Sequence, residues 1–284
     1  MTQKIYLNGF DVPPTYYVPY HEFLRQHAIS QFAAQQMGYA VELIFEDDCL
    51  TAALLYEDGD TQELELNPDQ RGLPYVAVEP HALYELQPVP TAPSYLGGTP
   101  PPGVQLPEFD FVAPFQYLGM LARREPAFDW LPFDLHLMAP LYLNFDGLFV
   151  DYTDPHAPRV LDEAALAKID NSFSEILRSD TVVEFSKTPV ALERVVAYGA
   201  EFGQVGVPSW IQHPQLPICP KSGKPLRFLV QLGLDAKLKT VRTNVPSDYR
   251  FHHSFEHLNF WGDGDLYVFF EPESRVAYYL IQHT

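Results

Sequence analysis

Three histidines and two aspartates near the end of the sequence are its best candidates for binding a metal ion. His253 and His257 lie four residues apart, so a helix would place both rings on one face, and His252 adjoins them. The residues between His253 and His257 are S-F-E, so the H-E-x-x-H pattern of zinc peptidases is missing. Asp263 and Asp265 follow without the spaced oxygen ligands of an EF-hand loop. A weak divalent site is one interpretation, and a solvated loop is the preferred one.

Other catalytic signatures are missing from the sequence. It contains no G-x-S-x-G elbow, neither phosphate-binding glycine pattern, and no cysteine-protease context around Cys49 or Cys219. Acidic pairs at 47–48 and 57–58 have the composition of paired hydrolase carboxylates, but solvated turns explain them more simply. We therefore predict no catalytic residue, no metal and no cofactor. Whether the chain is an enzyme stays open, with a non-enzymatic role preferred.

The charge balance restricts the class of partner. Lys and Arg total 18 and Asp and Glu total 37, which gives a formal net charge of −19. Such a surface repels phosphate backbones and anionic lipids, so we expect no nucleic acid and no membrane partner, whereas a basic protein would be attracted. No apolar run could span a bilayer and no signal peptide is recognised, so we expect a cytoplasmic protein. The composition leaves the oligomeric state open.

The positions of apolar residues, Pro and Gly predict the elements that would hold these residues. Residues 1–19, rich in Pro and Tyr, predict an extended arm, and residues 21–37 predict a helix closed by Gly38. Seven prolines between 88 and 107 predict a linker or rigid loop without regular strand pairing. Strands of an antiparallel meander are predicted at 40–45, 50–57 and 62–66, and helices at 162–178 (N-cap Asp162) and 189–198 (N-cap Thr188, then Pro189, with Gly199 as exit).

Four short blocks occur twice in the same order, which predicts an internal duplication. The longest pair is P-F-Q-Y-L-G-M-L at 114–121 and P-L-R-F-L-V-Q-L at 225–232. We therefore divide the chain into an N-terminal region at 1–90, a first unit at 91–161 and a second unit at 162–284. The other pairs are 98–100 with 206–208, 106–107 with 216–217, and 141–145 with 266–270.

The second unit also resembles a known family over residues 206–270. The matching pieces are G-V-P-S-W-I-Q from 206, L-P-I-C-P from 216, the block at 225–232, and G-D-G-D-L-Y-V-F-F from 262. They resemble the YwqG-like family, a bacterial domain of largely unassigned function. A related pattern occurs in eukaryotic programmed-cell-death-type proteins, which chaperone a ribosomal protein. Many relatives carry a C-P-x-C zinc knuckle where this chain has Ser222 after Cys219, so we expect no zinc site.

The motif residues have a structural and a functional interpretation. In the structural one, Trp210 wedges a loop over the core, and Gln212 and Gln231 satisfy loop backbone groups. The apolar runs at 228–232 and 266–270 are then strands covered on both faces. In the functional one, the motif binds a ligand or partner through Trp210, Gln212, Gln231, Asp263, Asp265 and Tyr267.

Together these patterns predict an α+β fold with two related β-rich units, mostly antiparallel or mixed sheets, and an N-terminal helix and meander. The leading hypothesis for function is a non-enzymatic cytosolic protein-binding module, an immunity-type or chaperone-type protein for a basic partner. The alternative is a small-ligand-binding protein or enzyme. Its pocket would lie between the duplicated halves, near Trp210, Gln231, Tyr267 and residues 252–257.

Overall fold

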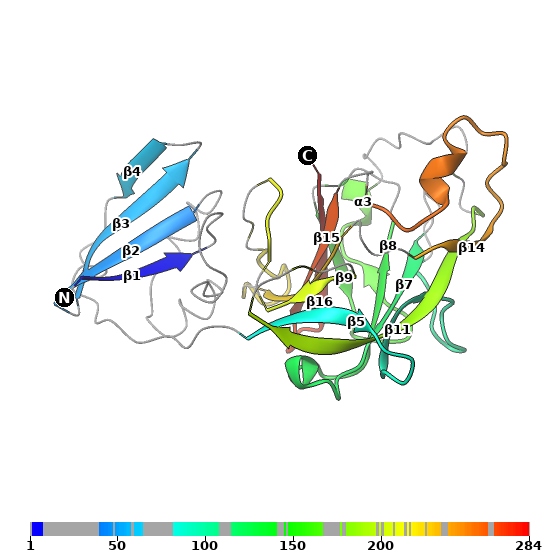
Figure 1. The fold of residues 1–284 in the computed structure, drawn as a ribbon, viewed down its shortest axis with the longest axis horizontal. Coiled ribbons are helices and arrows are strands. Elements are labelled where there is room, and N and C mark those ends of the chain that lie inside the picture. Colours follow the sequence, from blue (N-terminus) through cyan, green and yellow to red (C-terminus); the bar gives the residue numbers. More distant parts are fainter. Residues whose placement is uncertain are drawn as a thin grey trace.

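Strands dominate the computed structural model (Figure 1). Helical structure in the described residues amounts to the short helix α3 (Glu163–Leu166) and the 3-10 turns η2 (Pro126–Phe128) and η3 (His252–Phe255). The predicted α+β class is therefore wrong, and the described chain is mostly β. The structure describes residues 2–7, 40–47, 49–57, 60–64, 82–107, 115–140, 145, 147–166, 177, 180–196, 199, 202–206, 208–212, 215, 217–224, 226–233, 238–260 and 264–283.

The first strands form a small antiparallel sheet in the order β1-β2-β3-β4. The predicted meander is confirmed, with β2 (Ala40–Glu46), β3 (Cys49–Glu57) and β4 (Asp60–Leu64). Sequence analysis missed β1 (Thr2–Leu7), which lies in the predicted extended arm and pairs with β2 along its whole length. The predicted helix at 21–37 lies outside the described residues.

The remaining strands form one twelve-stranded sheet that curls on itself (Figure 1). Its order is β10-β9-β16-β15-β13-β12-β5-β11-β6-β7-β8, with β14 pairing on β11. All the described strand pairs are antiparallel. The strands are β5 (Leu83–Pro88), β6 (Ser94–Gly98), β7 (Gln116–Leu121), β8 (Leu135–Ala139), β9 (Leu148–Asp151), β10 (Arg159–Val160), β11 (Val183–Val195), β12 (Gln204–Val205), β13 (Arg227–Leu232), β14 (Thr240–Thr243), β15 (Asp265–Glu271) and β16 (Val276–Gln282).

The predicted helix at 189–198 is wrong, because β11 runs through Pro189 to Val195. β11 pairs with β6 as far as Val190 and with β5 from Val190 onward. Pro189 thus lies where the strand changes partner, and its carbonyl accepts a hydrogen bond from Val89 N at 3.0 Å. Pairing with two strands that are distant in the sequence overrides the local helix signal. Of the other predicted helix, α3 is the described helical part, and residues 167–176 lie outside the description.

The proline-rich segment contains a strand, which the sequence analysis excluded. β6 lies between Pro93 and Pro100, so the prolines flank the strand and do not interrupt its ladder. Gly97 has φ +68°, and a Cβ at this position would overlap the carbonyl oxygen of Ser186 on β11. Glycine therefore permits the close approach of β6 to β11.

The internal duplication stays a prediction. The longest repeated blocks fall on β7 and β13, and each strand has a register shift at the corresponding place. The shift lies between Tyr117 and Gly119 in β7 and between Phe228 and Val230 in β13.

Both faces of the strands that carry the motif are covered by apolar side chains. Leu266, Val268 and Phe270 of β15 lie in the main core, on the inner face of the curled sheet. Tyr267 and Phe269 lie in a second cluster on the opposite face. This arrangement confirms the prediction from the continuous apolar runs. The second cluster also contains Trp210, Cys219 and Leu226. The described residues of this stretch, 208–212, 215, 217–224 and 226, are termed the cover segment, and these three side chains pack it over the outer face.

Two tyrosines satisfy backbone groups of β8, the last strand of the sheet order. Tyr152 Oη donates to the carbonyl of His136 at 2.8 Å, and Met138 N donates to Tyr279 Oη at 3.5 Å. The two hydroxyls lie 2.6 Å apart, and Tyr152 has already used its proton, so Tyr279 is the donor between them. Side chains thus replace a ladder partner for β8. Burial raises the pKa of Tyr279 to about 12, so its hydroxyl keeps its proton at neutral pH.

Candidate functional site

The Gln231 side chain on β13 fixes the start of the cover segment. Its Oε1 accepts hydrogen bonds from Ser209 N at 2.7 Å and Gln204 Nε2 at 3.0 Å. Its Nε2 donates to Ser209 O at 2.9 Å and also contacts the Asp265 carboxylate. Gln231 is 3% exposed, so these bonds replace water for buried groups. Its contacts match the structural interpretation of this residue.

Tyr267 on β15 lies beside Gln231 and binds the same loop. Its hydroxyl donates to Ser209 O at 2.6 Å and accepts from Ile211 N at 3.1 Å. Burial, with a contribution from the Asp265 charge, raises the pKa of Tyr267 far above its usual range. The phenol is therefore a protonated donor at neutral pH, and its role in the geometry is to hold backbone.

The edge of this network contains Gln212 and a residue that the sequence analysis missed. Gln282 is fully buried, and its Oε1 accepts from Ile211 N at 3.2 Å and Gln212 N at 3.1 Å. The Gln212 side chain is exposed and donates to His283 O at 2.8 Å. Gln282 could have been predicted as part of this network, because it is a polar residue at the end of an apolar strand-forming run. Asp263, the remaining predicted site residue, lies outside the described residues.

Trp210 joins this polar network to the outer apolar cluster. Its ring stacks on Tyr267, with centroids 4.9 Å apart and planes inclined by 13°, and on Phe269 at 6.0 Å. It is 8% exposed, and its Nε1 has no hydrogen-bond partner among the described residues. Four of the six predicted residues (Trp210, Gln231, Asp265 and Tyr267) therefore converge.

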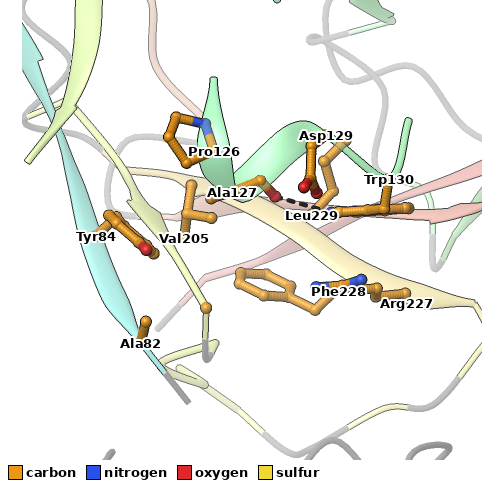
Figure 2. Close-up of a pocket in the computed structure, with 11 residues that line it drawn as sticks. Ala82, Tyr84, Pro126, Ala127, Asp129, Trp130, Val205, Arg227, Phe228 and Leu229 are labelled. Atoms are coloured by element: carbon orange, nitrogen blue, oxygen red, sulfur yellow. Dashed lines mark hydrogen bonds between the residues drawn. The ribbon is translucent and has the colours of Figure 1, made fainter. Parts of the chain in front are cut away.

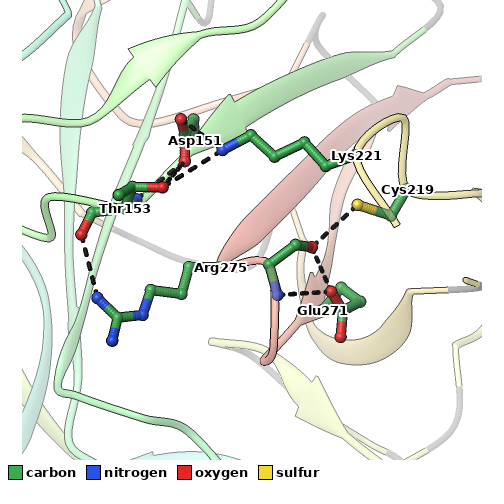
Figure 3. Close-up of polar contacts among 7 residues, drawn as sticks. Asp151, Thr153, Cys219, Lys221, Glu271 and Arg275 are labelled. Atoms are coloured by element: carbon green, nitrogen blue, oxygen red, sulfur yellow. Dashed lines mark hydrogen bonds and ion pairs between the residues drawn. The ribbon is translucent and has the colours of Figure 1, made fainter. Parts of the chain in front are cut away.

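A second polar cluster fixes the other end of the cover segment (Figure 3). Cys219 is buried, and its Sγ lies 3.1 Å from Ser274 Oγ. Ser274 Oγ donates its single proton to the Glu271 carboxylate, so the Cys219 thiol donates to Ser274. Ser222 Oγ also reaches Glu271, at 3.4 Å. Lys221 pairs with Asp151 on β9 at 2.6 Å, which ties the same turn to a third strand.

Asp151 and Glu271 predict that the protein loses stability in acid. Burial opposes ionisation of both, but hydrogen bonds lower the pKa of each below its ordinary value, from Lys221 and Thr153 to Asp151 and chiefly from Ser274 to Glu271. A carboxyl with a lowered folded-state pKa stabilises the fold above its unfolded pKa of about 4, and this contribution disappears as the pH falls through the folded pKa.

We therefore expect the unfolding free energy from urea titrations to fall as the pH drops from about 5 to about 3. The Glu271→Gln variant should show a smaller fall. The exposed neighbour Glu273 provides a matched control, and Glu273→Gln should keep the wild-type profile. Equal profiles for all three proteins would contradict the assignment to Glu271.

The predicted histidine group does not form a metal site in the described part of the chain. No group of three or more His, Cys, Asp or Glu side chains there could hold an ion. His252 Nδ1 lies 3.0 Å from Pro246 O at the start of η3, and His257 lies in an isolated bridge with Lys239. Cys219 and Glu271 likewise belong to no such group among the described residues, and Ser222 occupies the second knuckle position.

A pocket of about 200 Å³ lies elsewhere in the large sheet (Figure 2). Neither Trp210, Gln231 and Tyr267 nor residues 252–257 line it, so it differs from the position given by the sequence hypothesis. It takes its walls from both halves of the chain. The lining residues are Ala82, Tyr84, Pro126, Ala127, Asp129, Trp130, Val205, Gly206, Arg227, Phe228 and Leu229.

Comparisons of the chain with protein-family models, curated proteins and solved structures found no match. The resemblance to the YwqG-like family therefore rests on the motif residues alone and stays a prediction. Within the described residues, no helix is long and apolar enough to cross a membrane.

Proposed function

We propose that the chain is a non-enzymatic, cytoplasmic protein-binding module for a basic partner, of the immunity or chaperone type. The observation that carries this proposal is the formal net charge of −19. Exposed carboxylates attract a basic surface over several ångströms, which raises the association rate and makes it sensitive to salt. The exposed acidic residues in the described ranges are Glu46, Asp47, Glu63, Asp129, Asp134, Asp154, Asp162, Glu163, Asp180, Glu193, Asp248, Glu256 and Glu273.

The geometry of the motif supports this proposal over catalysis at the same residues. The polar groups of Gln231, Tyr267 and Gln282 bind the backbone of residues 209–212. A general acid or base must reach a substrate proton, and these groups face the protein's own loop. The motif therefore contributes a rigid surface, and recognition is assigned to the exposed carboxylates.

The test is affinity capture from a lysate of the native host, first at low salt and then at about 0.5 M salt, where charges are screened within a few ångströms. We expect a basic protein to be retained at low salt and released at high salt. The association rate of that protein, once purified, should fall steeply with ionic strength.

Two controls separate recognition from simple ion exchange. An unrelated protein of similar net charge should not retain the same partner. A variant with Asp154→Asn, Glu163→Gln and Glu193→Gln, all at exposed positions, should bind the partner more slowly without losing stability. Capture of the same proteins by the unrelated acidic control, or of no basic protein at low salt, would contradict the proposal.

A further inference from the structure

The pocket in Figure 2 combines an apolar wall with one charge of each sign. Val205, Phe228 and Leu229 are buried and supply apolar surface, and Tyr84 lines the pocket from β5. Among the lining residues, Arg227 and Asp129 are the two charged ones, and both are exposed at the surface. A ligand in this pocket would therefore meet a cation, an anion and apolar side chains together.

Trp130 holds Arg227 in a defined position. The guanidinium carbon lies 4.4 Å from the centre of the Trp130 ring. Trp130 is itself fixed, since its Nε1 donates to Ala127 O at 2.8 Å and its ring lies 6.2 Å from Phe270. The planar guanidinium carries five N–H donors in a fork that suits bidentate binding of a carboxylate.

Asp129 supplies the opposite charge one residue before Trp130. It follows the 3-10 turn η2, and no hydrogen bond or ion pair of its side chain occurs within the described residues. Its exposed carboxylate can accept hydrogen bonds from an ammonium group without breaking a contact to another described residue.

We propose that this pocket binds a free α-amino acid with an apolar side chain. The α-carboxylate would bind Arg227, the α-ammonium would bind Asp129, and the side chain would lie against Val205 and Phe228. Drug-sized ligands fill pockets of about 300–1,000 Å³, so a pocket of about 200 Å³ suits a smaller molecule of this size. The proposal is independent of a basic protein partner, because it involves a different site and a different ligand.

The test is isothermal titration of the full chain with L-leucine, L-methionine and L-phenylalanine. We expect at least one to saturate with a Kd below about 1 mM. Isoamylamine lacks the carboxylate of leucine, 4-methylpentanoate lacks its ammonium, and glycine lacks its side chain, so each should bind at least about tenfold more weakly than leucine. No saturation by any of the three amino acids up to about 10 mM would overturn the proposal.

Substitutions at the two charged residues assign the contacts. Arg227→Gln and Asp129→Asn should each weaken binding at least about tenfold. Arg250 also lies over an aromatic ring, with its guanidinium carbon 4.6 Å from the centre of the Phe251 ring, so Arg250→Gln is a matched control for which we expect wild-type affinity. Far-UV circular dichroism of each variant checks its fold. Wild-type affinity in both pocket variants, or binding of 4-methylpentanoate as tight as leucine, would overturn the assignment.

Discussion

The Gln231→Leu variant is expected to lose about 3–4 kcal/mol of unfolding free energy, because buried hydrogen-bonding groups would lose their partners. Leucine has a similar volume but offers no polar atom. Ser209 N, Ser209 O and Gln204 Nε2 would each lose a bond to this side chain. Removing one partner of a buried polar group costs about 1–3 kcal/mol, and part of this cost would be offset where Ser209, which is exposed, meets water.

Urea denaturation followed by far-UV circular dichroism measures this loss. The matched control is Gln212→Leu, which makes the same change in the cover segment itself. The Gln212 side chain is exposed and donates one hydrogen bond, to His283 O, so we expect a cost below about 1 kcal/mol. Equal costs for the two variants would show that the Gln231 network does not hold the cover segment.

Strands were predictable from the sequence where the residue pattern itself indicates a strand over several consecutive positions. The runs at 228–232 and 266–270 are apolar throughout, and the structure covers both of their faces. The meander at 40–66 was predictable for a similar reason, because β-forming runs alternate there with turn residues. In these segments local preference and tertiary environment agree.

The predicted helix at 189–198 failed because its signals are local and its structure depends on distant strands. Thr188, Pro189 and Gly199 fit helix ends in isolation. In the fold, β5 and β6 flank β11 on its two sides, and those pairs connect residues about a hundred positions apart. No window of the sequence contains that partner information. The strand β6 was missed for the related reason that its prolines lie outside the paired residues.

The candidate site was predictable by residue type but not by the role of each residue. Trp210, Gln231 and Tyr267 converge as the motif indicated, yet their polar atoms bind the cover segment. The pocket was missed because Asp129 and Arg227 are ordinary surface residues in the sequence. They line one pocket because the η2 turn lies beside β13 in the fold, and such a contact has no sequence signature.

The cover segment is held by polar side chains at two separated points, and Trp210 lies within the first of them. The Gln231 network holds residues 209–212, and the Cys219 cluster holds the turn after it. Trp210, Cys219 and Leu226 add apolar packing against β15 and β16. A segment with little regular secondary structure of its own thus covers the outer face, because side chains replace the missing ladder bonds.

The Trp210→Ala variant is accordingly expected to lose about 3–5 kcal/mol of unfolding free energy. The substitution removes the ring that stacks on Tyr267 and Phe269 and leaves a cavity under the cover segment. Urea denaturation measures the loss, and near-UV circular dichroism should show a changed tyrosine environment. Trp210→Phe keeps an aromatic ring and removes an Nε1 that has no partner in the described residues, so it should cost about 1 kcal/mol. Equal losses for the two variants would contradict the prediction, because they would show that an aromatic ring at this position does not by itself supply the stability.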